Sequence, residues 1–307
     1  MHAKLNSGDR MGIENGIAGV GHTRQRLASS CVCCGSADLA VSPAILMPFI
    51  ADRAFGWRPV VIDDSWGLNT IQSGNAYSIC KTMRCRRCEH LFCDIRFSEE
   101  EMENIYTGYR EEAYVRLREF YEPGYRGRND ALTVAVSYKQ QIEEFLSPFV
   151  SDPLTILDWG GDTGVNTPFE KRRANLDIFD ISGKAVGGDA RVVTREQATS
   201  SKYGLIVCSQ ILEHIPCPSD VLLTVRQAMD AESILYIEVP FEEVMRMDLK
   251  DREKVKRHWH EHINFYSMQS LQSLLHNCSL KILANNVLVT EVGGAAVHIL
   301  QVACRLA

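Results

Sequence analysis

Three histidines alternate with other residues in one short segment, His258-Trp-His260-Glu-His262-Ile-Asn-Phe-Tyr266. Histidine is the side chain best suited to accept a proton near neutral pH, and a neighbouring carboxylate can orient the imidazole or raise its basicity. The segment follows an apolar run that ends at Pro240. We therefore take His262, Glu261 and His260 as the candidate acid–base group.

Two other interpretations of the histidine segment remain open. The alternation of His258, His260 and His262 could bind a metal, but the spacing is not HExxH and no second carboxylate pattern accompanies it. All three rings could also have a purely structural role.

Two cysteine pairs have the spacing of metal-binding knuckles, Cys31-Val-Cys33-Cys34-Gly35 and Cys85-Arg-Arg-Cys88. Two residues between ligands let both thiolates face one tetrahedral ion. The spacing predicts a structural zinc held by Cys31, Cys34, Cys85 and Cys88, with Cys33 as a possible substitute. The pairs are about 50 residues apart, more than the 15–20 of a compact zinc ribbon, so the intervening segment must form its own structure. The alternative is two unrelated thiol pairs.

A glycine-rich turn, Asp158-Trp-Gly160-Gly161-Asp-Thr-Gly164, follows the apolar run Leu154 to Leu157. This succession indicates a buried strand that ends in a turn where backbone amides can approach a ligand closely. The turn lacks the full spacing of a dinucleotide fingerprint and, taken alone, it is a weak signal.

The elements around these residues alternate between strands and helices. Strands are expected at 154–157, 176–179, 205–208 and 234–239, and helices at 132–146, 219–229 and 268–277. A closing strand pair is expected at 280–288 and 297–304. This alternation predicts an α/β fold with a doubly wound, mostly parallel sheet and an antiparallel addition at its edge.

Three aspartates are expected beyond the carboxyl ends of these strands, where open α/β sheets bind ligands. Asp158 closes the first strand, and Asp180 closes the second one 22 residues later. A carboxylate about 20 residues after a glycine turn usually holds a ribose diol. Asp189 follows Gly187-Gly188, where it could meet an adenine amino group.

The ordered set resembles the class I S-adenosylmethionine-dependent methyltransferases. The resemblance implies a Rossmann-like, seven-stranded sheet and assigns the turn, with Asp158, Gly160, Gly161 and Gly164, to the cofactor. It gives Asp180 to the ribose hydroxyls, Asp189 to the adenine and Gln210 to the methionine side. Leu212-Glu213-His214 matches the motif that follows the third strand and often packs locally.

The histidine segment and the cysteine module together resemble the sugar-nucleotide methyltransferases over about residues 30 to 307. In the sugar C-methyltransferases a Glu–His pair removes a proton beside the transferred methyl, and Glu261 and His262 match that pair. Those enzymes carry a further C-terminal domain, whereas this sequence stops at Ala307. Methyl transfer to oxygen or to carbon of a sugar-like small molecule is therefore expected.

Composition limits the remaining function classes. The chain has 307 residues with a net charge of −6, and no basic block would grip nucleic acid. Eleven cysteines without a secretory signal, and no apolar run near 20 residues, predict a cytoplasmic protein that spans no membrane. The expected organisation is a tail (1–28), a cysteine module (29–97), a helical linker or substrate cap (98–130) and the methyltransferase domain (131–307).

Two alternative functions remain at this point, and the oligomeric state stays open. One is an RNA or protein methyltransferase that uses the zinc module as a reader. The other is a non-catalytic scaffold with the same fold.

Overall fold

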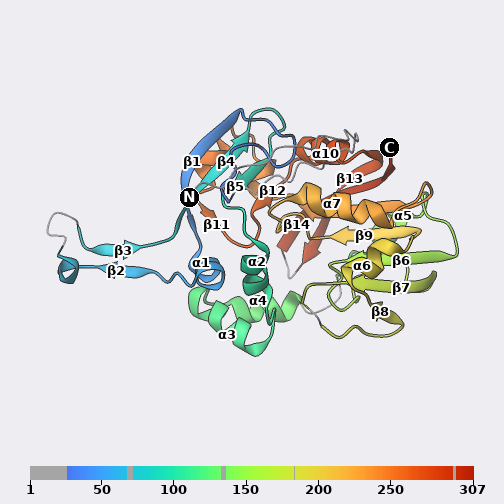
Figure 1. The fold of residues 1–307 in the computed structure, drawn as a ribbon, viewed down its shortest axis with the longest axis horizontal. Coiled ribbons are helices and arrows are strands. Elements are labelled where there is room, and N and C mark those ends of the chain that lie inside the picture. The colour runs from blue at the N-terminus through green and yellow to red at the C-terminus, as the bar shows by residue number, and fades with distance from the viewer. Residues whose placement is uncertain (1–25, 68–71, 133–135, 183, 293–294) are drawn as a thin grey trace, which may run out of the picture.

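The central sheet of the protein has seven strands in the order β13-β14-β10-β9-β6-β7-β8 (Figure 1). The structure is a computed structural model that describes residues 26–67, 72–132, 136–182, 184–292 and 295–307. The strands are β6 (Leu154–Trp159), β7 (Arg173–Phe179), β8 (Ala190–Val192), β9 (Leu205–Ser209), β10 (Ile234–Pro240), β13 (Leu280–Val292) and β14 (Ala295–Leu306). The first five run parallel, and β14 pairs antiparallel with both β10 and β13.

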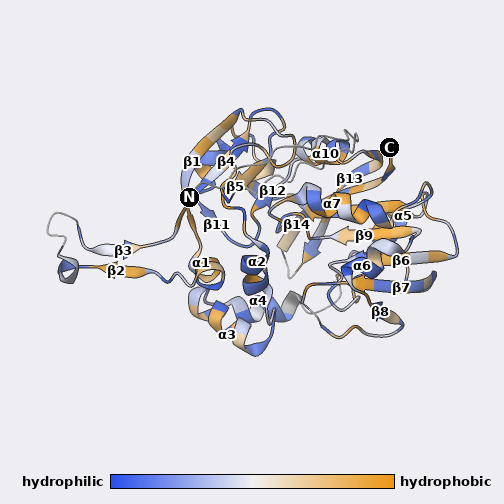
Figure 2. Ribbon diagram, in the orientation of Figure 1, coloured by the Kyte–Doolittle hydropathy of each residue, from blue (hydrophilic) through white to orange (hydrophobic). Residues whose placement is uncertain are grey.

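The strands of this sheet are apolar on both faces, because helices cover both. Side chains alternate along each strand, so Ile156 and Val207 join one core with α5 (Lys139–Leu146). Leu157 and Ile206 join the core on the other face, with α7 (Pro218–Val225) and α10 (Met268–Asn277). Figure 2 shows these inner strands as largely hydrophobic. The predicted α/β fold with a mostly parallel sheet is confirmed.

Several boundaries differ from the prediction. The strand β8 and the helix α6 (Arg195–Ser200) were not expected, and the helix expected at 132–146 begins at Lys139. Residues 160–172, which connect β6 to β7, form turns and contain no helix. The predicted tail lies mostly outside the described residues.

A second sheet of five strands combines two distant parts of the chain in the order β11-β1-β4-β5-β12. Its strands are β1 (Leu39–Leu46), β4 (Ile79–Cys85), β5 (Leu91–Cys93), β11 (His258–Trp259) and β12 (Asn264–Phe265). Both ends of the histidine segment therefore form strands of this sheet. Strand pairing thus joins the predicted cysteine module to the predicted methyltransferase domain.

Short helices and one hairpin complete the fold. The helices are α1 (Pro48–Phe55), α2 (Glu99–Tyr106), α3 (Glu112–Tyr121), α4 (Tyr125–Leu132), α8 (Glu243–Arg246) and α9 (Arg252–Val255). The 3-10 turns are η1 (Asp64–Trp66) and η2 (Arg226–Ala228), and the hairpin strands are β2 (Val60–Ile62) and β3 (Gly74–Ala76). A capping box between Ser98 and Glu101 fixes the start of α2. In the part of the chain that the structure describes, no helix has the length and apolar character needed to cross a bilayer.

Candidate active site

The glycine turn after β6 folds tightly against its neighbours. Gly160 has a φ of +82°, and a Cβ there would stand 2.1 Å from Ile211 Cδ1. A Cβ on Gly161 would stand 2.6 Å from Cγ of Asp158, and one on Gly164 2.6 Å from Ile178 Cδ1. A Cβ at any of these positions would force a neighbouring side chain or the turn to move, so the tight turn favours the glycines that the sequence supplies.

Asp158 is buried at the end of β6, beneath this turn. Thr167 Oγ1 donates a hydrogen bond of 2.5 Å to its carboxylate. Burial raises the pKa of Asp158 to about 7, against the effect of the Thr167 bond, and the neighbouring carboxylate of Asp180 adds to the rise. A buried carboxyl group whose pKa is close to 7 is typical of ligand sites.

Asp180 lies beside the same turn, one residue beyond β7. Its carboxylate accepts hydrogen bonds from the backbone N–H groups of Asp162 at 2.9 Å and Ser182 at 2.7 Å. The Gly160 N–H donates to the carbonyl of Phe179 at 2.6 Å. The ends of β6 and β7 are thus joined, with two aspartates at one edge of the sheet.

Gln210 reaches this edge from β9. It has a φ of +55°, and its N–H donates to the carbonyl of Glu238 on β10 at 3.0 Å. Glu238 is a buried carboxylate that accepts from Tyr138, Tyr236 and Ser209. The structure therefore brings Asp158, the glycines, Asp180 and Gln210 together, as the sequence predicts.

Asp189 is not part of this group. It precedes β8 and pairs with Arg173, the first residue of β7, through a guanidinium contact of 2.5 Å. Because β7 and β8 are parallel, this pair lies toward the amino ends of the strands. The structure therefore does not bring Asp189 to this group, because Asp189 precedes β8 instead of following a strand.

His262 is the centre of the candidate acid–base group. Its Nδ1 lies 3.0 Å from Glu242 Oε1, so Glu242, and not Glu261, is its hydrogen-bond partner. Burial disfavours the charged ring, but the bond to Glu242 and the carboxylates of Glu213 and Glu261 outweigh it and raise the pKa of His262. The Nδ1 bond leaves Nε2 free to accept a proton.

Glu261 instead forms a two-pronged ion pair with Arg118 of α3, at 2.8 and 3.0 Å. Burial would favour the neutral acid, but Arg118 and the two nearby histidines lower the pKa of Glu261 to about 2. Glu261 is therefore a fixed negative charge rather than a proton acceptor. Arg118 is itself buried.

His214 joins the group from the loop after β9. Its ring lies 4.6 Å from that of His262, and its Nδ1 is 2.8 Å from the hydroxyl of Tyr106 on α2. Burial lowers the pKa of His214 to about 3, so this ring is neutral. Side-chain ligand atoms of Glu213, His214 and His262 all lie within 4.8 Å of one another.

Glu213 is the least satisfied member of the cluster. It is 1% exposed, and neither of its carboxylate oxygens has a hydrogen-bond partner among the described residues. Burial raises its pKa to about 7. The motif Leu212-Glu213-His214 thus meets the histidine segment instead of only packing locally.

The other two histidines lie farther out. His260 Nδ1 is 3.4 Å from Glu122 of α3, and His258 is exposed with its ring 5.7 Å from that of His260. The three alternating histidines do not gather around one point, because only His262 joins Glu213 and His214.

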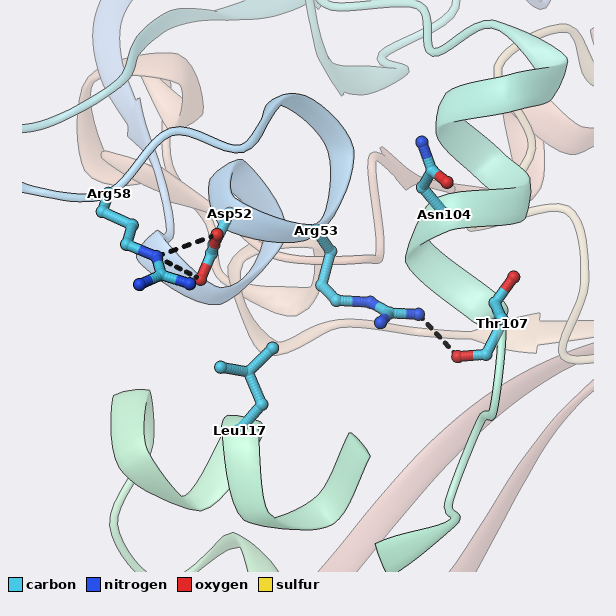
Figure 3. A pocket seen from close by; sticks show the side chains of 6 residues that line it. All are labelled: Asp52, Arg53, Arg58, Asn104, Thr107 and Leu117. Carbon is cyan, nitrogen blue, oxygen red and sulfur yellow. Dashed lines mark hydrogen bonds and ion pairs between the residues drawn. The ribbon is translucent and has the colours of Figure 1, made fainter. Parts of the chain in front are cut away.

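Hydrogen bonds from helix α1 hold the C-terminal end of helix α2 in place. Arg53 of α1 donates to the carbonyl of Thr107 at 2.6 Å and to that of Ile105 at 3.3 Å (Figure 3). Tyr106 lies between these residues and turns its hydroxyl to His214. A cavity of about 290 Å³ lies beside Arg53, and Asp52, Arg58, Asn104 and Leu117 also line it. This cavity is separate from the histidine cluster.

The four predicted cysteine ligands meet at one point. Ligand atoms of Cys31, Cys34, Cys85 and Cys88 lie within 4.8 Å of one another, with Sγ–Sγ distances of 3.5 Å for Cys31–Cys88 and Cys34–Cys85. Thiolates about 2.3 Å from a tetrahedral zinc stand at a similar separation. Cys33 is buried and is not among the four cysteines whose ligand atoms converge.

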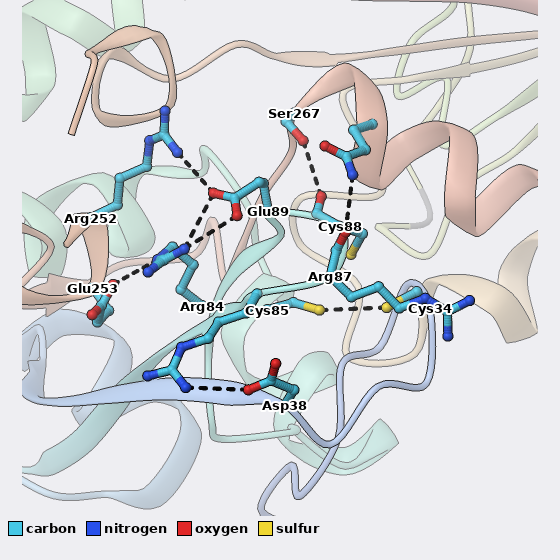
Figure 4. Close-up of polar contacts among 12 residues, drawn as sticks. Cys34, Asp38, Arg84, Cys85, Arg87, Cys88, Glu89, Arg252, Glu253 and Ser267 are labelled. Carbon is cyan, nitrogen blue, oxygen red and sulfur yellow. Dashed lines mark hydrogen bonds and ion pairs between the residues drawn. The ribbon is translucent and has the colours of Figure 1, made fainter. Parts of the chain in front are cut away.

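The cysteine knuckles are attached to the methyltransferase half. Ser267 donates to the carbonyl of Cys88 and Asn277 to that of Cys33, both from the ends of α10. Beside them, Arg84 pairs with Glu253 and Glu89 with Arg252 (Figure 4). The cluster therefore fixes the second sheet against α9 and α10.

Sequence reasoning missed Glu242 as a functional residue and left Glu213, His214 and Tyr106 in lesser roles. Glu242 lies only two residues after Pro240 at the end of β10, a position that could have drawn attention to it. The pairing of Tyr106 with His214 joins residues 108 positions apart, and no local pattern encodes it.

With this geometry established, comparison with known proteins identifies the class. Residues 131–285 match a family model described as a methyltransferase domain. Because the match covers just over half of the chain, the protein belongs to this family. It is an S-adenosylmethionine-dependent methyltransferase.

Solved structures resemble the protein at low sequence identity. The glycopeptide N-methyltransferase MtfA complexed with sinefungin is 12% identical with a TM-score of 0.43, covering 57% of this chain and 99% of that chain. Magnesium protoporphyrin IX methyltransferase (ChlM) from Synechocystis PCC 6803 is 16% identical with a TM-score of 0.41, covering 66% and 96%. Likeness at this level carries no argument about the acceptor. No curated protein matches the chain.

Proposed function

We propose that the protein transfers a methyl group from S-adenosylmethionine to a small hydroxylated acceptor, a sugar or nucleotide-sugar, and that His262 removes the acceptor's proton. One observation carries this proposal. The loop after β9 touches the glycine turn through Ile211 and the histidine cluster through His214, three residues later. A donor on the turn would stand next to a proton acceptor.

The cofactor residues follow from the group at the edge of the sheet. We infer that the amides of the glycine turn, with Asp158 beneath them, hold the amino-acid portion of the donor. Asp180 would accept from the ribose hydroxyls, since its oxygens retain acceptor capacity after binding two amides. Gln210 would line the methionine side. S-Adenosylmethionine supplies the electrophilic methyl group on its sulfonium.

The chain's own residues orient and deprotonate the acceptor. His262, held by Glu242 through Nδ1, would accept the acceptor's proton on Nε2. Glu261, fixed by Arg118, stabilises the imidazolium that results. Because methyl transfer is an in-line displacement, positioning contributes much of the rate.

A small acceptor is supported by the enclosure of the cluster. The side chains of His214 and His262 are only 20% and 33% exposed, and helices α2 and α3 lie against them through Tyr106 and Arg118. The sugar class rests on the resemblance of the histidine segment and the cysteine module to sugar-nucleotide methyltransferases.

We also propose that Cys31, Cys34, Cys85 and Cys88 hold a structural zinc ion. Four thiols at near-tetrahedral separations fit this metal, and a four-thiolate set leaves no open position for chemistry. The zinc would fix the second sheet, which carries the histidine segment.

The His262→Ala variant tests the chemical step. Turnover should fall by about 10²–10⁴-fold while the affinity for S-adenosylmethionine stays nearly unchanged. Cofactor binding that collapses together with turnover would contradict the role of His262. The acceptor class is tested by mass spectrometry of nucleotide-sugar pools incubated with the enzyme and S-adenosylmethionine, where a product heavier by one CH₂ unit is expected.

A further inference from the structure

A β-hairpin projects from the second sheet, away from the rest of the molecule (Figure 1). We name residues 56–67 and 72–79 the arm; it contains β2, the turn η1 and β3. None of its described residues is buried. A lone two-stranded hairpin is marginally stable in water, so this arm lacks the packing that such an element needs.

The arm exposes large apolar side chains along its length. Trp66 at the tip is 52% exposed and Val61 on β2 is 61% exposed, while Trp57 and Tyr77 near the base are each 41% exposed. Figure 2 shows β2 in the hydrophobic colour. Apolar groups gathered on one projecting element indicate a surface that another surface covers.

A second apolar surface lies where the arm leaves the sheet. In the antiparallel pair β1–β4, Pro43 is opposite Lys81 and Ile45 is opposite Ile79, so these four share one face with Val41. We name these five residues the root face. Ile79 is 82% exposed and Val41 is 50% exposed, whereas the alternate residues of β1 point into the core.

The charges at the two ends of the arm are opposite. Asp63 and Asp64 at the tip are exposed. At the base the Arg58 side chain is 74% exposed and pairs with Asp52 of α1 at 3.2 Å. Lys81 of the root face is exposed and has no ion-pair partner among the described residues, so it supplies the unpaired positive charge of the base. Two arms that lie antiparallel across a two-fold axis bring the acidic tip of each to the basic base of the other.

The dimensions agree with such an arrangement. The nine steps from Trp57 to Trp66 span up to about 30 Å when extended, and the eight residues of β1 span about 26 Å. A tip that reaches the partner's root face would set Trp66 against Ile79 and Val41. The contact is isologous, because each copy offers the same two surfaces.

We propose that the arm is an exchange element through which two copies of this chain form a homodimer, with the arm of each copy lying across the root face of the other. The occupant of the root face is therefore a second copy of the chain. Apolar contact supplies the affinity, and the tip-to-base charge pairs fix the antiparallel direction.

Sedimentation velocity of the full chain at about 10–50 µM tests the dimer. The expected mass is twice the 34.5 kDa of one chain. Trp66→Ala should weaken the dimer at least about 10-fold, since aromatic anchors dominate interfaces. Phe120→Ala is the matched control, because Phe120 is 76% exposed but lies on α3 outside both surfaces.

Charge reversal tests the direction of the arms. A tip variant (Asp63→Lys, Asp64→Lys) and a base variant (Arg58→Glu, Lys81→Glu) should each be monomeric, because like charges then meet in the homodimer. An equimolar mixture of the two should form a heterodimer, in which both contacts again join opposite charges. Circular dichroism verifies that each variant is folded.

Three outcomes would overturn the proposal. The first is a monomeric full chain. The second is a dimer that every variant retains, which would put the interface elsewhere. The third is a monomer that dimerises only when residues 1–25 are removed, which would assign the root face to that segment.

Discussion

Two imidazole rings lie side by side in the candidate active site, and their surroundings give them opposite properties. His262 is bonded to Glu242 and faces two further carboxylates, which raise its pKa above the usual value. His214 has the Glu213 carboxylate only at 3.8 Å, beyond hydrogen-bond distance, and burial lowers its pKa to about 3. Of the two, only His262 has a raised pKa and thus a greater tendency to hold a proton, which is why we assign the proton transfer to it.

The bond to Glu242 predicts the pH dependence of the reaction. As a base, His262 must be neutral, so kcat/KM should rise with pH through the raised pKa of this ring. Glu242→Gln removes the charge that stabilises the imidazolium, so the pKa falls and the acid limb of the profile moves to lower pH. Glu243→Gln, one residue along and exposed, should leave the profile unchanged. An unmoved limb in the Glu242 variant would contradict the assignment.

We expect the buried carboxylate of Glu213 to lower the stability of the protein while it supports activity. Its folded-state pKa of about 7 is above the value of 4.5 for an ordinary glutamate, so its stabilising contribution is complete below about pH 4.5 and is lost as pH rises through 7. At pH 8 Glu213→Gln should raise the free energy of unfolding by about 1–3 kcal/mol and lower turnover. Denaturant unfolding at pH 8 and pH 4.5 measures this difference, which should vanish at the lower pH. A variant that is less stable than wild type at pH 8 would show that Glu213 has a partner in solution.

At the scale of elements, the turn after β6 depends on close contact rather than on glycine flexibility alone. Gly160→Ala introduces a Cβ 2.1 Å from Ile211 Cδ1. We expect it to reduce S-adenosylmethionine affinity at least about 10-fold, because Ile211 or the turn must move. Gly124→Ala is the matched control, since Gly124 also has a positive φ, +89°, but nothing lies within 4 Å of its Cβ position. Equal effects of both variants on cofactor affinity would contradict the steric argument.

The cysteine cluster predicts which thiols hold metal. Cys34→Ser should lower the zinc content measured by atomic absorption and the melting temperature, because it removes one of four converging ligands. Cys33→Ser, at the adjacent buried position, should retain one zinc per chain. The reverse pattern would show that Cys33 is the ligand.

Elements with a repeating pattern could be predicted from the sequence, and elements without one could not. Four of the five parallel strands (β6, β7, β9 and β10) and α10 have apolar patterns, and the structure has them close to the expected residues. Strands β11 and β12 have two residues each, too few for any periodicity, and they form only because the second sheet offers them edges. Asp189 was expected beyond a strand end, but it precedes β8, a three-residue strand that the sequence pattern did not predict.

Site residues follow the same division. Asp158, Asp180 and Gln210 were predictable because parallel strands bring their ends to one edge. Glu242 and Tyr106 contact histidines that are distant in the sequence. The local sequence around a residue does not specify its partner in such a tertiary contact. The convergence of the four cysteines could be predicted because two short spacings recur.

At the scale of the whole molecule, the two sheets together position the two parts of the candidate active site. The central sheet provides the glycine turn, and the second sheet, anchored at the cysteine cluster, holds the segment that carries His262. The loop with His214 connects the two. The proposed methyl transfer uses both sides of this arrangement, so removal of the proposed zinc should lower activity through loss of structure, with the melting temperature and turnover falling together.

Calorimetric titration of S-adenosylmethionine into the wild type, Asp180→Ala and Asp189→Ala tests the central claim most directly. The account predicts that Asp180→Ala weakens binding at least about 10-fold, because Asp180 lies at the turn. Asp189→Ala should bind like the wild type, because that carboxylate pairs with Arg173 toward the other end of the strands. Unchanged binding by the Asp180 variant, or a loss confined to the Asp189 variant, would contradict the proposed cofactor site.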